Sequence, residues 1–90
     1  MRVEKSIRVV NKLGLHTRAA AKLVKLCAGF GSSVSLCNGQ RTADAKSIMS
    51  VMMLAASQGT DLELAVDGDD AEEAARKIAY LFENCFEEDE

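Results

Sequence analysis

Apolar residues in this chain change their spacing along the sequence, and this change constrains the fold more than any other feature. Residues 3, 5, 7 and 9 are Val, Lys, Ile and Val, and they alternate with the polar residues 4, 6 and 8, as in a strand with one buried face and one amphipathic lysine on it. From Thr17 the apolar residues are instead three or four positions apart, as in a helix that Gly29 ends. Both kinds of segment recur over only 90 residues. The chain is therefore expected to form short strands and helices around one modest core.

The middle of the chain predicts a hairpin followed by a short helix. Residues 33–37 alternate like a strand, and an Asn-Gly pair follows at 38–39. Such a pair favours a tight hairpin, because both turn residues need a positive φ. Ser47 then offers an N-cap to the apolar segment 48–57, and Gly59 marks the end of this expected helix.

The last part of the chain predicts one more strand and a long closing helix. Residues 62–66 alternate, and Asp69 with Glu72 resembles a capping box before apolar residues at helical spacing that reach Cys85. The predicted order is β-α-β-β-α-β-α. Amphipathic elements in this order indicate an α+β fold, an antiparallel sheet with its helices on one face.

Composition excludes several classes of protein. Hydrophobic residues make up 48% and charged residues 28% of the chain, as in an ordinary globular domain. No apolar run approaches the roughly 18 residues that would cross a bilayer, and the first ten residues lack the apolar stretch of a signal peptide. Neither membrane insertion nor export is expected. One domain over residues 1–86 is expected, followed by an acidic tail at 87–90.

The three cysteines point to a reducing compartment. Cys27, Cys37 and Cys85 cannot all pair within one chain, and none belongs to a CxxC pair. This pattern argues against a disulfide scaffold and against a zinc site, and it favours the cytoplasm.

Charge is divided unequally along the sequence. Residues 1–46 hold nine basic and two acidic side chains, a net charge of +7, whereas the remainder carries −10. The basic half could face nucleic acid, an acidic protein or a phosphorylated ligand. Nucleic acid is disfavoured because Phe30 is the one aromatic residue in that half, which leaves no platform for stacking bases.

His16 is the single histidine, and it lies where a loop becomes a helix. The N–H groups of a helix start lack intrahelical partners and attract anions. A neutral imidazole is also a competent nucleophile. A phosphoryl group on His16 would lie over the amides of Thr17 and Arg18, with the Arg18 guanidinium as a second anchor. Gly14 lets the backbone come close.

A simpler interpretation is that His16 is a surface or capping residue without chemistry. Two observations favour the chemical interpretation: Arg18 follows closely, and the sequence lacks a second histidine, a cysteine pair or a carboxylate cluster. One nucleophile beside an anion site fits a protein that accepts phosphate and passes it on.

Residues 46–54 support two interpretations, a capped core helix and a contact surface. A phosphate on Ser47, at the start of this segment, would add charge beside that surface. The core interpretation assigns buried positions to Ile48, Val51, Leu54 and Ala55. The surface interpretation assigns a partner-binding patch to Lys46, Ile48, Met49 and Met52, because methionines suit adaptable interfaces.

Two motifs resemble one family over nearly the whole chain. Residues 14–20, Gly-Leu-His-Thr-Arg-Ala-Ala, resemble the active-site signature of HPr, the histidine-containing phosphocarrier of the bacterial phosphoenolpyruvate-dependent sugar phosphotransferase system. Residues 46–52 are similar to the regulatory-serine segment of that family. The resemblance implies an open-faced β-sandwich with four antiparallel strands and three helices, present in the cytoplasm as a monomer without a cofactor.

The resemblance also implies roles for individual residues. His16 would take phosphate from enzyme I, through an acidic docking surface on that partner, and give it to enzyme IIA domains. Arg18 would steady the phosphoryl group, and Ser47 would be the target of a serine kinase and phosphatase. Two positions depart from the family pattern: Ala19 stands where many members have proline, and Thr17 where alanine is common.

Two alternatives differ from a sugar-pathway carrier. One is a regulatory paralogue, of a nitrogen-related branch or acting mainly through Ser47; the retained His16 argues against a purely serine-based regulator. The other is a small α/β ligand- or RNA-binding domain, since ferredoxin-like folds share this element order. An RNA reader would carry aromatic residues on its strands, and the predicted strands have none.

Overall fold

The computed structural model describes residues 1–87 and contains the predicted order of strands and helices. None of its helices within these residues is long and apolar enough to cross a membrane. Along the chain the elements are β1 (Arg2–Arg8), α1 (Thr17–Ala28), β2 (Ser33–Asn38), β3 (Arg41–Asp44), α2 (Ile48–Met53), β4 (Asp61–Asp67), α3 (Ala71–Glu83) and the 3₁₀ helix η1 (Cys85–Glu87).

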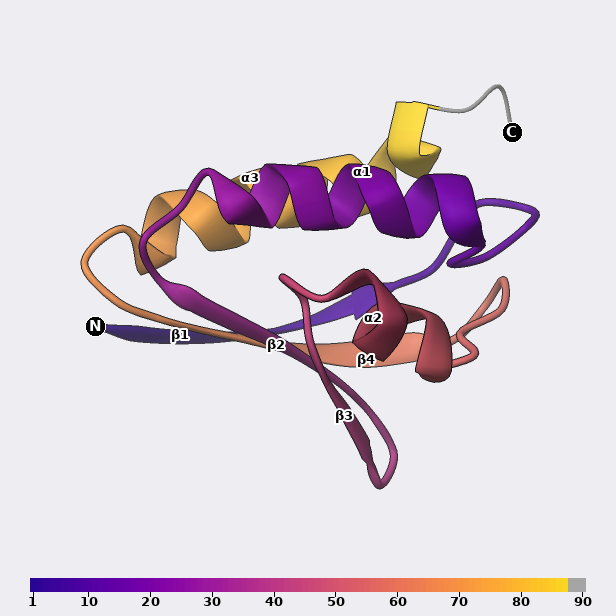
Figure 1. Cartoon of the computed structure of the whole chain (residues 1–90), viewed down its shortest axis with the longest axis horizontal. Helices are drawn as coiled ribbons and strands as arrows, with labels where there is room; N and C mark the ends of the chain where they lie inside the picture. The colour runs from indigo at the N-terminus through magenta and orange to yellow at the C-terminus, as the bar shows by residue number, and fades with distance from the viewer. Residues whose placement is uncertain (88–90) are drawn as a thin grey trace.

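The four strands form one antiparallel sheet in the order β1-β4-β2-β3. β1 pairs with β4 from Arg2 opposite Asp67 to Arg8 opposite Asp61. α1 and α3 lie side by side over one face of the sheet, and α2 lies nearer the end where α1 begins (Figure 1). The predicted antiparallel sheet with three helices is confirmed.

The core lies between the sheet and the helices, and the alternation in the sequence explains it. On β4 the buried residues are Leu62, Leu64 and Val66, while their neighbours Asp61 and Glu63 are exposed. The helices complete the core with their apolar sides. The residues they bury include Ala20, Leu23 and Cys27 from α1, Val51 from α2, and Ile78 and Phe82 from α3.

The helix α2 is shorter than the sequence predicts. A helix over 48–57 is expected, but α2 ends at Met53, and Ala55 has a φ of +52°, which a right-handed α-helix does not contain. Arg41 from the hairpin donates from Nη1 to the Met53 carbonyl at 3.1 Å. This side chain satisfies a carbonyl that has no partner within the helix, so the chain can turn away there.

The predicted capping box at Asp69 and Glu72 is wrong in its details. Asp70 is the N-cap residue of α3, and its side chain makes no capping hydrogen bond. The carboxylate instead accepts the N–H groups of Gly31 and Ser32, each at 3.0 Å, and the Ser32 hydroxyl. Asp70 therefore ties the loop between α1 and β2 to the start of α3.

The end of the described chain is held against the helices. Phe86 is buried, with its ring 4.7 Å from the ring of Phe82 between centroids. Lys22 on α1 donates from Nζ to the Phe86 carbonyl at 2.7 Å. Of the acidic tail expected at 87–90, Glu87 is an exposed residue of η1, and the other three lie outside the described residues.

We expect the Asp70 interaction to stabilise the fold in a pH-dependent manner. Hydrogen bonds from the Ser32 hydroxyl and the Gly31 N–H hold the pKa of the Asp70 carboxyl below its ordinary value. The stabilisation is therefore present above the unfolded-state pKa of about 4 and is lost as pH falls towards the folded-state pKa. Asp70→Asn should lower the melting temperature at pH 7, and the gap to wild type should narrow by pH 3. A gap of equal size at both pH values would contradict this assignment.

Candidate functional site

His16 is the N-cap residue of α1 and does not use its side chain to cap the helix. Its backbone is extended (φ −75°, ψ 177°), and its carbonyl accepts the Ala20 N–H at 2.8 Å. The residue is half-buried, so one side of it faces solvent. The imidazole therefore lies at the N-terminus of α1, beside first-turn N–H groups that have no intrahelical acceptor.

The charges around this helix start favour an anion. Thr17 and Arg18 are exposed on the first turn, and that turn contains no acidic residue. Arg18 adds a full positive charge to the partial charge of the helix dipole. Unpaired backbone N–H groups at a helix start and a nearby cation both favour binding of an anion such as phosphate. Within residues 1–87, His, Cys, Asp and Glu side chains form no cluster suited to a metal ion.

The loop before α1 is fixed against the segment after α2. The Leu15 N–H donates to the Ala56 carbonyl at 2.9 Å, and the Leu15 side chain is buried. Gly14 has a φ of +67°, and a Cβ there would lie 2.5 Å from the Ala56 oxygen. Glycine is therefore required at position 14 both by conformation and by space. Figure 1 shows these two loops at the same end of the molecule.

Ser47 is the N-cap residue of α2, as the sequence predicts. Its hydroxyl accepts the Ser50 N–H at 3.3 Å. The core interpretation of this helix is correct for Val51 and Leu54, which are buried, and wrong for Ile48 and Ala55, which are exposed. Ile48 lies outside the narrow buried side of this short helix, whereas Ala55 lies past its end, where the backbone is no longer helical.

The exposed side of α2 is apolar. We call Ile48, Met49, Met52 and Met53 the methionine patch; their exposed fractions are 37%, 70%, 37% and 70%. The sequence interpretation named the first three; it missed Met53, which lies four residues after Met49 and so on the same side of the helix. Leu13 on the loop before α1, another residue that the sequence interpretation did not single out, is 67% exposed. Lys46 is also exposed, and its Nζ donates to the Phe30 carbonyl at 2.8 Å.

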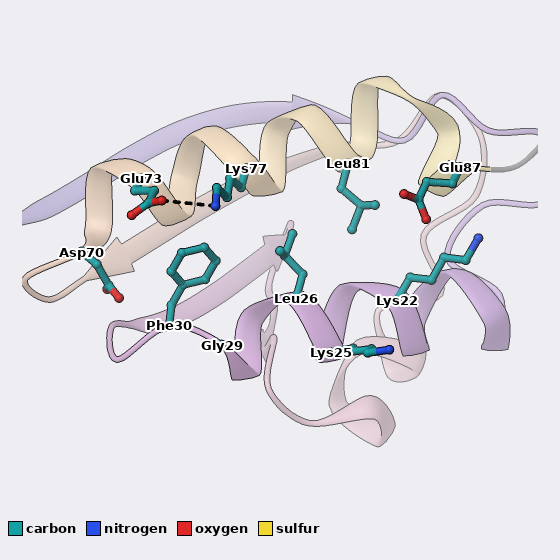
Figure 2. Close-up of a pocket in the computed structure, with 10 residues that line it drawn as sticks. All are labelled: Lys22, Lys25, Leu26, Gly29, Phe30, Asp70, Glu73, Lys77, Leu81 and Glu87. Atoms are coloured by element: carbon teal, nitrogen blue, oxygen red, sulfur yellow. Dashed lines mark ion pairs between the residues drawn. The ribbon is translucent and has the colours of Figure 1, made fainter.

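A groove of about 800 Å³ lies between α1 and α3 (Figure 2). Lys77 in its wall pairs with Glu73 at 3.2 Å and lies 5.9 Å from the centre of the Phe30 ring. The charged residues lining this groove are Lys22, Lys25, Lys77, Asp70, Glu73 and Glu87. Cations and carboxylates are equal in number there, so the groove lacks the excess of positive charge found at the start of α1.

The fold and the site together define a small α+β domain whose anion-favouring helix start is open to solvent. A helix start suited to an anion lies open to solvent on an open-faced β-sandwich, and the neighbouring helix exposes an apolar patch. An open site of this kind can be reached by a side chain of a second protein.

Comparison with known proteins identifies the family. The profile described as "PTS HPr component phosphorylation site" matches residues 3–84. A phosphocarrier protein HPr of Xylella fastidiosa is 49% identical over 97% of this chain and 98% of its own. The crystal structure of an HPr from Thermoanaerobacter tengcongensis superposes with a TM-score of 0.93 at 39% identity, covering 98% of this chain and 99% of that one. The chain belongs to the HPr family of phosphocarrier proteins of the phosphotransferase system.

The comparison also bears on the alternatives. Phosphocarrier protein NPr of Escherichia coli is 38% identical over 99% of this chain and all of its own. The family therefore includes relatives of both names, and the higher identity is to the HPr relative. A ligand- or RNA-binding domain of the ferredoxin-like type is set aside, since the family and the fold are those of HPr.

We expect Gly14→Ala to destabilise the protein and to disturb the start of α1. The new Cβ would meet the Ala56 oxygen, and the left-handed backbone alone costs an alanine about 1–3 kcal/mol. Gly39→Ala is the matched control, because Gly39 has a similar φ of +63° but nothing within 4 Å of its Cβ position. Urea unfolding should show a larger loss for Gly14→Ala, with backbone amide shifts at residues 15–18. Equal losses without such shifts would contradict the close contact.

Proposed function

We propose that this protein carries a phosphoryl group from phosphorylated enzyme I to enzyme IIA domains as a phosphohistidine at His16. The observation that carries the proposal is the half-buried imidazole at an uncapped, acid-free start of α1 beside Arg18. Membership of the HPr family supports the same function.

The transfer requires only groups that the chain provides. A neutral ring nitrogen of His16 attacks the phosphorus of the donor phosphohistidine, and a new N–P bond forms as the donor N–P bond breaks. The donor ring, protonated on its other nitrogen, leaves as a neutral imidazole, while His16 keeps its own ring proton on the nitrogen that does not attack; protons and electrons therefore balance. The transferred phosphoryl oxygens then accept hydrogen bonds from the first-turn amides of Thr17 and Arg18 and from the Arg18 guanidinium. Transfer to the acceptor reverses these events.

The methionine patch, with Lys46, provides the docking surface in this proposal. The patch is exposed next to the loop that carries His16, and methionines adapt to differently shaped partners. The net charge of +7 over residues 1–46 suits the acidic surface of enzyme I that the family resemblance implies. One surface can then serve donor and acceptor in turn.

We further propose that the protein is a cytoplasmic monomer and a carrier rather than an enzyme. The three cysteines are free, which fits the reducing environment of the cytoplasm. Burial raises the pKa of the Cys27 thiol to about 12, so this thiol stays protonated and is not a catalytic nucleophile. An open site that holds a phosphoryl group between two partners needs no enclosed substrate pocket. Residues 1–86 form the domain in this proposal.

Ser47 is the proposed target of a serine kinase and phosphatase. Its hydroxyl lies at the start of α2, directly beside Ile48 and Met49 of the methionine patch. A phosphate there adds about 1.5–2 negative charges at neutral pH. Such a charge would oppose docking on an acidic partner surface without requiring a change of fold.

His16→Ala should abolish phosphorylation and leave the fold intact, because the side chain makes no capping bond. The wild-type chain, incubated with phosphoenolpyruvate and enzyme I, should gain one phosphate by intact mass and lose it in mild acid, as a phosphoramidate does. A folded His16→Ala variant that still gains an acid-labile phosphate would show that the acceptor is another residue.

Arg18→Ala should keep the fold and slow transfer. Loss of one charge-assisted contact costs about 1.5–3 kcal/mol, which corresponds to a rate about 10- to 100-fold lower. Arg76→Ala on α3 is the control, since it removes the same charge from an exposed position on another helix. Rapid-quench transfer rates should separate the two variants; equal rates would mean that Arg18 does not contact the phosphoryl group.

Ser47→Asp should weaken docking on enzyme I and slow phosphorylation of His16, with a smaller effect at high salt, where charges are screened. Aspartate is a good N-cap residue, so α2 should persist. Ser47→Ala is the control, because it removes the cap at a cost of about 1 kcal/mol but adds no charge. Phosphorylation rate is measured against enzyme I concentration at low and high salt. If the two variants behave alike, charge is not the cause, and Ser47 serves only as a cap.

A further inference from the structure

Two polar residues are buried within residues 1–87, and one of them lies close to His16 in the sequence. Asn11 is 0% exposed and Ser32 is 1% exposed. Burying a primary amide is costly unless its donors find acceptors. Ser32 is explained by its hydrogen bonds to Asp70. Asn11 occupies the loop between β1 and α1, where its contacts bear on the candidate site.

Asn11 closes the turn that precedes His16. Its side chain donates from Nδ2 to the Gly14 carbonyl at 2.7 Å, and the Gly14 N–H donates back to the Asn11 carbonyl at 3.2 Å. Two hydrogen bonds between the same two residues brace the turn from within. Because one of them uses a side-chain amide, an apolar residue at position 11 would leave the Gly14 carbonyl without this donor.

Both ends of this turn are attached to the segment that follows α2. Val9 donates its N–H to the Thr60 carbonyl at 2.9 Å and accepts the Gly59 N–H at 2.7 Å. On the other side, Leu15 donates to Ala56. The turn is thus fixed at both ends by the backbone hydrogen bonds of Val9 and Leu15, and the Asn11 side chain determines its conformation between them. Directly after the second fixed point the chain reaches His16 and begins α1.

We propose that Asn11 is a positioning residue for phosphoryl transfer, which rests on the proposed function of His16. The Asn11 amide fixes the direction in which the chain enters α1. It thereby fixes the position of the imidazole relative to the backbone N–H groups of Thr17 and Arg18. Asn11 contacts neither the phosphoryl group nor a partner. Its effect on rate arises because a displacement of about 1 Å at a reacting group can slow a reaction by about 100-fold.

Steady-state transfer from enzyme I tests this role with Asn11→Ala, which removes the amide, and Asn11→Leu, which retains most of the side-chain volume. Both should lower kcat by about 10- to 100-fold. KM for enzyme I should stay within about two-fold, because the methionine patch is unaltered. Ser32→Ala is the matched control: it disrupts the other buried polar site, beyond the opposite end of α1, and should lower the melting temperature without altering kcat or KM.

Folded Asn11 variants that lose stability as Ser32→Ala does, yet transfer phosphate at the wild-type kcat, would overturn the proposal and assign Asn11 a structural role alone. Failure of the wild-type chain to carry phosphate on His16 would instead reject the proposed function.

A second test uses the wild-type chain alone. The Asn11 side-chain N–H groups should exchange slowly with solvent before and after phosphorylation, and fast exchange in either state would contradict the brace.

Discussion

The site depends on one backbone contact, the hydrogen bond from the Leu15 N–H to the Ala56 carbonyl. The contact forms where Gly14 has no side chain, and a Cβ at that position would collide with the same carbonyl oxygen. It joins two segments that are far apart in the sequence, the loop that leads into α1 and the segment that leaves α2. Because of this contact, the histidine at the start of one helix and the apolar surface of another are held in a fixed relation.

The openness of the site follows from the same arrangement. His16 is half-buried at a helix end rather than enclosed in a cleft, so the phosphoryl group that we propose it carries can be reached from outside by more than one partner. In this proposal the first-turn amides and Arg18 hold the group, because both provide positive charge at the helix start. The neighbouring methionine patch provides apolar area, whereas the groove between α1 and α3 has balanced charges and lies along the other side of α1.

The sequence predicted most of the fold, because a sheet with one buried face imposes alternation and the helices impose their own spacing. The prediction from the sequence was wrong where a side chain bonds to another element, and this affected the end of α2 and the capping of α3. Arg41 binds the carbonyl of Met53 and helps to end α2 early. The Asp70 carboxylate accepts the N–H groups of Gly31 and Ser32 in the neighbouring loop instead of capping its own helix. Neither event leaves a local pattern. The position of His16 at a helix start could be predicted because it is visible in the sequence. The contacts of Asn11 and Ala56 involve backbone carbonyls and have no sequence signature.

We propose that His16 carries the phosphoryl group over the first turn of α1. An isotope-labelled chain, phosphorylated by phosphoenolpyruvate and enzyme I, allows this to be observed directly by NMR. We expect a phosphorus coupling to a ring nitrogen of His16, with the largest backbone amide shifts at Thr17 and Arg18. Phosphorus coupled to any other residue, or amide signals of residues 17 and 18 that do not shift, would show that the group is carried elsewhere.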